Sequence, residues 1–197
     1  MPLQKRIATE YHGKPAGARQ PKTLGRKALL RRFQWISEDL IERVSREFPV
    51  AITKHWAEKA GASPVDPLLI QVLPDPRELV PSGGDLPDPV ADCAKSPVPW
   101  LVQKHPDRAL LLVTKRCHVY CRYCFRRDHS PGERLDPSEE ELSLAIQTAH
   151  NSGARELILS GGDPLSLTDS ALGRILHRVR PMFPVLRIHT RAPVTAP

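Results

Sequence analysis

The spacing of hydrophobic residues changes along the chain, and each spacing predicts a different kind of element. Between residues 33 and 48 apolar side chains recur every three or four positions, which predicts an amphipathic helix. Ser37 is suited to cap this helix and Pro49 to end it. A shorter helix is expected over residues 52–60, whereas residues 1–32 lack a sustained period and are expected to be loose.

The C-terminal part of the chain alternates short apolar runs with helical patterns. The apolar runs predict three buried strands, at residues 110–114, 157–160 and 185–190. Helical patterns fill the two intervals, one from Asp136, as its acidic cap, to Gly153 and one over residues 169–180. Strands and helices that alternate in this way indicate parallel βα units with right-handed crossovers, and therefore an α/β fold.

Residues 61–106 contain ten of the 21 prolines and show little periodicity. Such a stretch favours an extended segment over a separate domain. We therefore expect three regions: a basic disordered tail over 1–34, a helical and then proline-rich extended segment over 35–106, and an α/β core over 107–197. The extended segment is expected to pack against the core.

Three of the four cysteines, Cys117, Cys121 and Cys124, follow the first predicted strand at a Cys-x3-Cys-x2-Cys spacing. Thiolates this close can bind one metal centre together, and three ligands would leave one iron of a four-iron cluster open to a substrate or cofactor. A zinc site is one alternative, with His129 or Cys93 as the fourth ligand. Unligated thiols are another, although three clustered cysteines beside arginines are unusual as core residues. Outside the zinc alternative, Cys93 is interpreted as having no role in a metal site.

Two further motifs follow the other predicted strands. Gly161-Gly162-Asp163-Pro164 comes after the second strand, and Thr190-Arg191 comes after the third. Because the carboxyl ends of parallel strands meet at one edge, we expect both motifs to lie beside the cysteines. By itself, the glycine motif is equally compatible with an ordinary turn.

The residues HPDRALLLVTKRCHVYCRYCFRR, with SGGDP and RIHTRAPV downstream, resemble the radical S-adenosylmethionine (SAM) superfamily and, within it, the lysine 2,3-aminomutase family. The resemblance extends from about Phe48 to the C-terminus and includes the branch that supplies β-lysine for modifying elongation factor P. It implies a (βα)6-type partial TIM barrel, of which this chain would form the first half with about three βα units. We therefore expect the chain to be C-terminally truncated.

The resemblance also implies roles for individual residues. The three clustered cysteines would hold a 4Fe-4S cluster whose fourth iron binds SAM. The other implied contacts are with SAM for Gly161, Gly162, Asp163 and Arg191, with pyridoxal 5′-phosphate (PLP) for Arg108, and with the carboxylate of the substrate L-lysine for Arg126.

The implied enzyme is an isomerase that converts L-lysine to β-lysine. A 5′-deoxyadenosyl radical made from SAM would take a hydrogen atom from lysine that is held as an imine with PLP. Two positions differ from the family pattern: Lys104, where an arginine is common, and Phe125, where a smaller residue is common. No residue can be assigned to the imine or to the substrate's side-chain amine, so we expect the 197-residue chain to have no turnover of its own.

Other functions remain open from the sequence alone. Within the superfamily, the chain could act on another amino acid, such as glutamate, or activate a protein by hydrogen abstraction. Outside it, a non-enzymatic iron–sulfur or zinc protein could use the basic tail to bind nucleic acid. Iron and labile sulfide content separates a zinc protein from the first group, and cleavage of SAM separates an inert iron–sulfur protein.

Charge and composition narrow these alternatives. The net charge is +7, but residues 1–34 hold nine Lys or Arg and one acid, so the rest of the chain is close to neutral. A basic tail of this kind is usually solvated, and we expect a small-molecule partner rather than a nucleic acid. The sequence has no run of 18 apolar residues and no leader-like N-terminus, which predicts a cytoplasmic protein without membrane contact. A homo-oligomer is compatible with the sequence.

Overall fold

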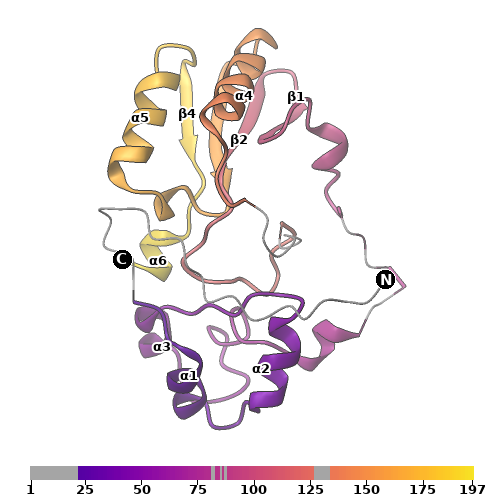
Figure 1. The fold of residues 1–197 in the computed structure, drawn as a ribbon, viewed down its shortest axis with the longest axis vertical. Helices are drawn as coiled ribbons and strands as arrows, with labels where there is room; N and C mark the ends of the chain where they lie inside the picture. The colour runs from indigo at the N-terminus through magenta and orange to yellow at the C-terminus, as the bar shows by residue number, and fades with distance from the viewer. Residues whose placement is uncertain (1–21, 81–82, 85, 87, 127–133) are drawn as a thin grey trace.

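The computed structural model describes residues 22–80, 83–84, 86, 88–126 and 134–197. They form a helical part and an α/β part, which lie at the bottom and the top of Figure 1. The helical part contains α1 (Arg26–Arg32), α2 (Glu38–Ser45) and α3 (Lys54–Lys59). In the described ranges, no helix is long and apolar enough to cross a membrane.

The α/β part is built on a four-stranded sheet. Its strands, in spatial order, are β1 (Leu101–His105), β2 (Arg108–Thr114), β3 (Glu156–Gly161) and β4 (Val185–Ile188). Strands β2, β3 and β4 are parallel, and β1 is antiparallel to β2. The crossovers are α4 (Glu139–Asn151) and α5 (Asp169–Val179), and the short elements are η1 (Pro76–Leu79), η2 (Cys93–Lys95), η3 (Pro164–Ser166) and α6 (Ala192–Thr195). This open, mostly parallel α/β sheet confirms the predicted partial-barrel fold class.

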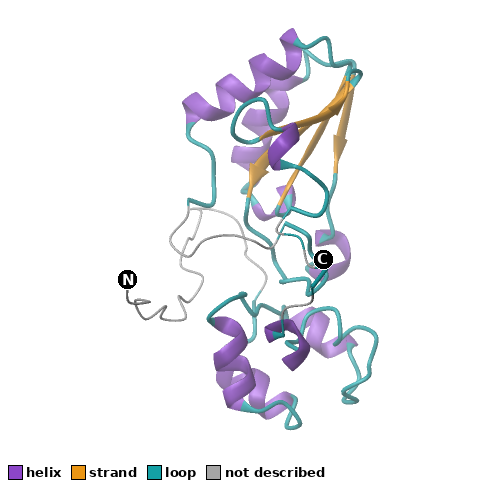
Figure 2. Ribbon diagram, turned by 90° about the vertical axis from the view of Figure 1, so that its right-hand side faces the viewer, coloured by secondary structure: helices purple, strands orange, loops and turns teal. Residues whose placement is uncertain are grey.

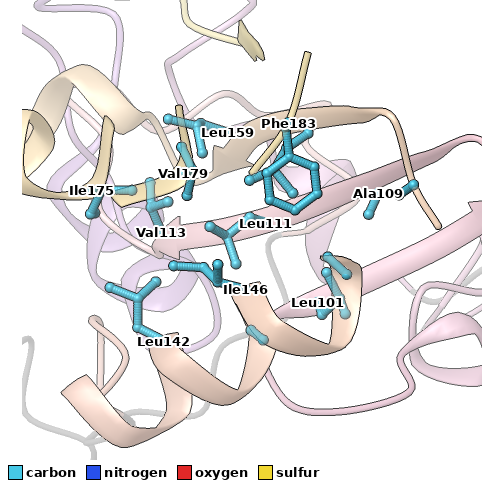
Figure 3. Close-up of a cluster of buried hydrophobic side chains, with 14 residues drawn as sticks. Leu101, Ala109, Leu111, Val113, Leu142, Ile146, Leu159, Ile175, Val179 and Phe183 are labelled. Carbon is cyan, nitrogen blue, oxygen red and sulfur yellow. The ribbon is translucent and has the colours of Figure 1, made fainter. Parts of the chain in front are cut away.

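Alternation along the strands separates the two faces of the sheet. One face packs against α4 and α5 and carries the main hydrophobic core, in which Leu111 and Leu159 are fully buried (Figure 3). Figure 2 shows both crossover helices on this side of the strands. The cross-strand row that points to the opposite face consists of Val102, Leu110 and Ile158. One face of the sheet therefore forms the hydrophobic core, and the opposite face is not covered by α4 and α5.

The helical part has its own core, which includes one residue from the cysteine loop, residues 115–126. Ser37 caps α2 by accepting a hydrogen bond from Leu40 N at 3.1 Å, as predicted, and Thr53 caps α3. Val119 of the cysteine loop is 3% exposed and packs into this core. The apolar residues of the helical part therefore hold the loop in place as well as each other.

The prediction of a disordered basic tail is wrong for the last part of residues 1–34. Residues 26–32 form α1, and Leu29 and Phe33 at its end are 3% and 0% exposed. These side chains lie four positions apart and therefore share a helix face, but their stabilisation comes from packing against residues distant in the sequence. The prediction for residues 1–21 lies outside the described residues.

The predicted boundary between residues 106 and 107 is also wrong, because it divides a hairpin. Strand β1 lies in the segment that was expected to be extended, and its Leu101 pairs with Leu111 of β2. The turn between them contains Pro106 and Asp107, residue types that favour tight turns. A run of only five residues with little alternation gave no strand signal by itself.

A buried ion pair joins the helical part to the cysteine loop. Arg122 is paired with Glu78 of η1, with Nε 3.0 Å from Oε1, and the two side chains are 6% and 11% exposed. Arg122 Nη1 also donates to the carbonyl oxygen of Pro49 at 2.7 Å. Loss of one partner of a buried pair leaves the other charge poorly compensated.

Glu78→Ala should therefore lower the free energy of unfolding by about 3–5 kcal/mol, measured by urea denaturation. Asp39→Ala, which removes an exposed partner of Arg43, is the matched control and should change little. Equal effects of the two substitutions would show that the Arg122–Glu78 pair does not secure the loop.

Candidate functional site

Backbone hydrogen bonds hold the cysteine loop on two sides. Towards the helical part, Tyr120 N donates to Ala51 O at 2.9 Å and Arg122 N to Gln71 O at 2.8 Å. Towards the sheet, Asp163 N donates to Arg116 O at 2.7 Å. Main-chain anchors of this kind fix the loop's path independently of the side chains it carries.

The three thiols of the loop share one neighbourhood. Cys117 is exposed, Cys121 and Cys124 are partly buried, and none forms a disulfide. Although the residue as a whole is exposed, the protein around its thiol desolvates it, and this raises the pKa of Cys117 strongly. The charges of Asp163, Cys124 and Cys121 raise that pKa further, whereas the charge of Arg191 lowers it. The thiolates would therefore be stabilised by a positively charged metal centre.

Within the described ranges, no three His, Cys, Asp or Glu side chains converge to hold a single metal ion. An iron–sulfur cluster does not require this convergence, because each thiolate binds its own iron. Of the fourth ligands considered for zinc, Cys93 lies in η2 and its N–H donates to Asp88 at 2.8 Å, whereas His129 lies outside the described residues.

The two glycines after β3 allow two backbones to approach closely. Gly161 has φ of +120°, and a Cβ there would lie 2.2 Å from the carbonyl oxygen of Thr114. A Cβ on Gly162 would lie 2.1 Å from the carbonyl oxygen of Arg116. These glycines therefore seat the SGGDP segment against the start of the cysteine loop. Their predicted contact with SAM stays a prediction.

Asp163 connects the motifs that follow β3 and β4. Its carboxylate is 6% exposed and accepts hydrogen bonds from the Thr190 hydroxyl at 2.6 Å and from the N–H groups of Arg191 and Ala192 at 2.8 and 3.0 Å. It also caps η3 through Leu165 N at 3.0 Å. With four donors already bound, this carboxylate orders the turn after β4, and its predicted contact with SAM stays a prediction.

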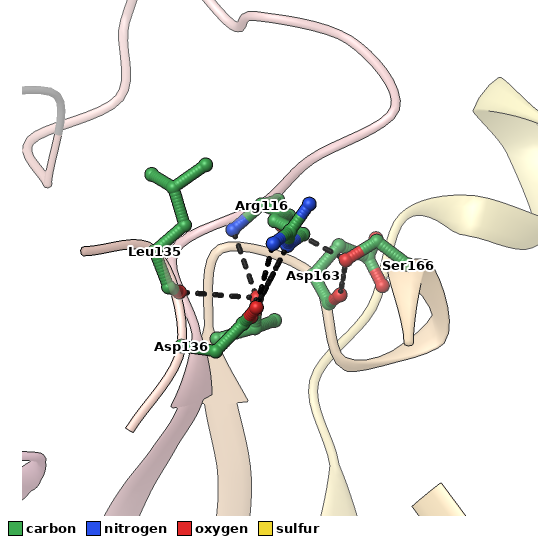
Figure 4. Close-up of polar contacts among 6 residues, drawn as sticks. Arg116, Leu135, Asp136, Asp163 and Ser166 are labelled. Atoms are coloured by element: carbon green, nitrogen blue, oxygen red, sulfur yellow. Dashed lines mark hydrogen bonds and ion pairs between the residues drawn. The ribbon is translucent and has the colours of Figure 1, made fainter. Parts of the chain in front are cut away.

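Asp136 does not cap α4 as predicted, because it binds the start of the cysteine loop instead. Ser138 caps α4, in a capping box with Glu141. Figure 4 shows Asp136 against the guanidinium of Arg116, with Nε to Oδ2 at 3.0 Å, and Thr114 Oγ1 donates to Asp136 Oδ1 at 2.7 Å. The side chain of Arg116 is thus tied to the segment before α4, while its carbonyl binds the SGGDP segment.

Arg191 brings the third motif to the cysteines. Its Nη1 lies 2.6 Å from Cys121 Sγ, and its Nη2 donates to Gln71 Oε1 at 2.9 Å. The guanidinium carbon is 5.2 Å from the ring centre of Trp56 and 5.5 Å from that of Tyr123. The prediction that all three motifs meet at one edge of the sheet is therefore confirmed.

A small basic cavity of about 140 Å³ lies on the sheet face opposite α4 and α5. Arg108 and Arg126 both line it, as do Lys104 and His105, and its floor is the apolar row of Val102, Leu110 and Ile158. The two arginines assigned to anions from the sequence are thus brought to one cavity. A larger open groove of about 580 Å³ lies between α1 and α3, but none of the three motifs lines it.

Asp92 is a site residue that the sequence did not reveal. Its Oδ2 lies 2.8 Å from Arg126 Nε and its Oδ1 2.6 Å from Lys104 Nζ. The preceding residue, Ala91, has φ of +55°, a left-handed backbone conformation that is strained for any residue other than glycine. Asp92 was missed because it is distant in the sequence from the residues it contacts. Gln71 and Trp56, the partners of Arg191, were missed for the same reason.

One polar atom beside the cysteines has no partner in the described part of the chain. His118 Nδ1 is buried and makes no hydrogen bond there, and desolvation lowers the pKa of the imidazole. A buried polar atom without a partner is costly unless a bound group satisfies it. Its place next to Cys117 is compatible with a group bound at the thiols.

Comparison with known proteins agrees with this geometry. The family model of the radical SAM superfamily matches residues 111–197, which include all three motifs. Residues 111–197 therefore form a radical SAM domain. The superfamily implies a 4Fe-4S cluster and SAM, and three clustered thiols, a cation beside Cys121 and the unpaired His118 Nδ1 fit such groups.

The relatives of this radical SAM chain include several L-lysine 2,3-aminomutases. It is 37% identical over 169 residues to that of Bacillus subtilis, 36% over 159 to that of Buchnera aphidicola and 34% over 170 to that of Clostridium subterminale. These matches cover 82%, 79% and 81% of this chain but 36%, 46% and 39% of the relatives. The chain thus spans less than half the length of each.

The cysteine assignment is tested by metal analysis. After anaerobic reconstitution, the protein should hold iron and labile sulfide in equal amounts, and Cys117→Ala, Cys121→Ala or Cys124→Ala should each lose most of both. Cys93→Ala is the matched control and should retain them. Bound zinc without labile sulfide, or an intact cluster in Cys121→Ala, would contradict the assignment.

Asp163→Asn tests the carboxylate that joins two motifs. An amide places an N–H group among donors, so at least one buried donor loses its acceptor, and the free energy of unfolding should fall by about 1–3 kcal/mol. Hydrogen exchange at the Arg191 and Ala192 amides should accelerate. The exposed Asp169→Asn is the control. Unchanged exchange at both amides would show that Asp163 does not order this turn.

Proposed function

We propose that this protein is a lysine 2,3-aminomutase-like isomerase that uses a 4Fe-4S cluster, SAM and PLP to convert L-lysine to β-lysine. The supporting observation is that the cysteine loop leads directly into the basic cavity: Arg126, two residues after Cys124, lines the cavity together with Arg108. A metal-binding loop and an anion-binding cavity joined in this way suit a reaction that needs an amino acid beside the cluster.

The cavity has the charge to bind two anionic groups. Arg126 would bind the α-carboxylate of lysine, because a guanidinium can donate two parallel hydrogen bonds to a carboxylate. Arg108 would bind the phosphate of PLP. Both are paired with carboxylates of the chain, which orient the guanidinium groups: Arg126 with Asp92 at 2.8 Å and Arg108 with the exposed Asp107 at 3.1 Å. The apolar floor lowers the local dielectric and strengthens each contact.

The three cysteines would hold the cluster, and the turn that Asp163 orders would close one side of it. When bound, the cluster with SAM supplies the hydrogen-abstracting radical, and PLP supplies the π-system that allows the amino group to migrate. The protein's own residues bind, orient and exclude water. Arg122 and Val119 contribute by fixing the loop to the helical part.

The proposal is tested by product analysis, with dithionite, SAM and PLP, of a version of the protein extended to the length of its relatives, because no turnover is expected of the 197-residue chain itself. L-lysine should give β-lysine, with formation of 5′-deoxyadenosine, whereas L-glutamate should not react. If SAM is cleaved and glutamate reacts in place of lysine, the protein is an aminomutase with a different substrate. No cleavage of SAM by cluster-loaded protein would exclude radical SAM chemistry.

Substitutions of Arg126 and Arg108 should affect different ligands. In the version extended to the length of its relatives, Arg126→Lys should raise the KM for lysine about tenfold or more with little effect on PLP affinity, because an ammonium cannot reproduce the paired hydrogen bonds. Arg108→Ala should weaken PLP binding, measured by absorbance titration, more than it affects lysine. The residue assignment fails if both substitutions affect both ligands equally.

A further inference from the structure

The side chain of Arg191 is fixed at its far end by four neighbours. Nη1 lies 2.6 Å from Cys121 Sγ and Nη2 lies 2.9 Å from Gln71 Oε1. The guanidinium also lies over the rings of Trp56 and Tyr123. Two of these neighbours belong to the cysteine loop and two to the helical part, so the cation is held where the loop and the helical part meet.

The backbone of Arg191 is fixed as well. Asp163 accepts its N–H at 2.8 Å, and the hydroxyl of Thr195 donates to its carbonyl oxygen at 3.1 Å. The helical part reaches the same turn, because Thr53 Oγ1 donates to Thr195 O at 2.5 Å. With both ends restrained, the guanidinium has little freedom to leave Cys121.

We propose that Arg191 donates an N–H···S hydrogen bond to the Cys121 thiolate of the assembled iron–sulfur cluster and thereby raises the reduction potential of the cluster. This inference rests on the cluster of the proposed function. Reduction adds one electron, so a fixed cation and a hydrogen-bond donor at a ligand sulfur stabilise the reduced state more than the oxidised state. Arg191 is then a positioning residue for the cluster, whereas the family resemblance implies that it contacts SAM.

Among the residues that the structure describes, no carboxylate forms an ion pair with the guanidinium of Arg191. The side-chain contacts described for it are a sulfur, an amide oxygen and two aromatic faces, none of which carries a full negative charge before the thiolate forms. Cation–π contacts hold a guanidinium without neutralising it. The whole charge is therefore available to the thiolate.

The test is a redox titration of the reconstituted full chain. Dithionite delivers one electron per cluster, from the 2+ to the 1+ state, and the reduced form is followed by EPR while iron and sulfide content is measured in parallel. The variants are Arg191→Gln, which removes the charge, and Arg191→Lys, which keeps it. Arg187→Gln is the control, because Arg187 lies on β4, just before the turn that carries Arg191, and pairs with Glu156 at 2.7 Å.

Arg191→Gln should make the potential more negative, so that the ratio of reduced to oxidised cluster at a fixed potential falls about tenfold, which is about 59 mV for one electron. Arg191→Lys should fall between this variant and the wild type, and Arg187→Gln should match the wild type within a factor of about two. A potential unchanged in Arg191→Gln, with the cluster intact, overturns the proposal even if SAM affinity drops.

Loss of the cluster from both Arg191 variants would also overturn the proposal, because the contact would then be needed for assembly and not for the potential. Absence of iron and sulfide from the wild-type protein is a different result. It would refute the proposed function itself, on which this inference depends.

Discussion

The close approach of two backbones after β2 and β3 is the constraint on which the rest of this structure depends. The carbonyl oxygens of Thr114 and Arg116 lie where a side chain on Gly161 or Gly162 would have to be. The N–H groups of Gly162 and Asp163 instead donate to these oxygens, both at 2.7 Å. A parallel sheet places the two strand ends together, and the glycines allow their loops to merge into one surface.

The positions of the cysteine loop and of the turn after β4 depend on that merged surface. It sets the start of the cysteine loop, and it positions Asp163 to order the turn that carries Arg191. The helical part holds the loop from the other side, through the Arg122–Glu78 pair and the buried Val119. The thiols are therefore presented by a segment that is fixed on two sides, whereas the sheet face beyond Arg126 provides a separate cavity for anions.

The parts of this arrangement that could be predicted from the sequence are those with local signals. Apolar runs marked β2, β3 and β4, and periodic patterns marked α2, α4 and α5, with the cap of α2 predicted correctly at Ser37. Because parallel strands end at one edge, the meeting of the three motifs also followed. The family resemblance added the candidate roles of Arg108 and Arg126, whose shared cavity the structure then showed.

What could not be predicted depends on partners far away in the chain. Strand β1 exists because Leu101 and Val102 pair with β2, and α1 because Leu29 and Phe33 are buried by other segments. Asp136 had the expected residue type for a helix cap, but in the structure it binds Arg116 and Thr114 instead. Asp92 and Gln71 have no local signature, since Gln71 lies 120 positions from the Arg191 it contacts.

The central claim is that the cysteine loop holds an iron–sulfur cluster with one iron left open for SAM. Mössbauer spectroscopy of protein reconstituted with 57Fe tests it most directly. Addition of SAM should shift the signal of a single iron to values typical of higher coordination and leave the others unchanged. A spectrum that SAM does not alter, in protein with a complete cluster, would contradict the account.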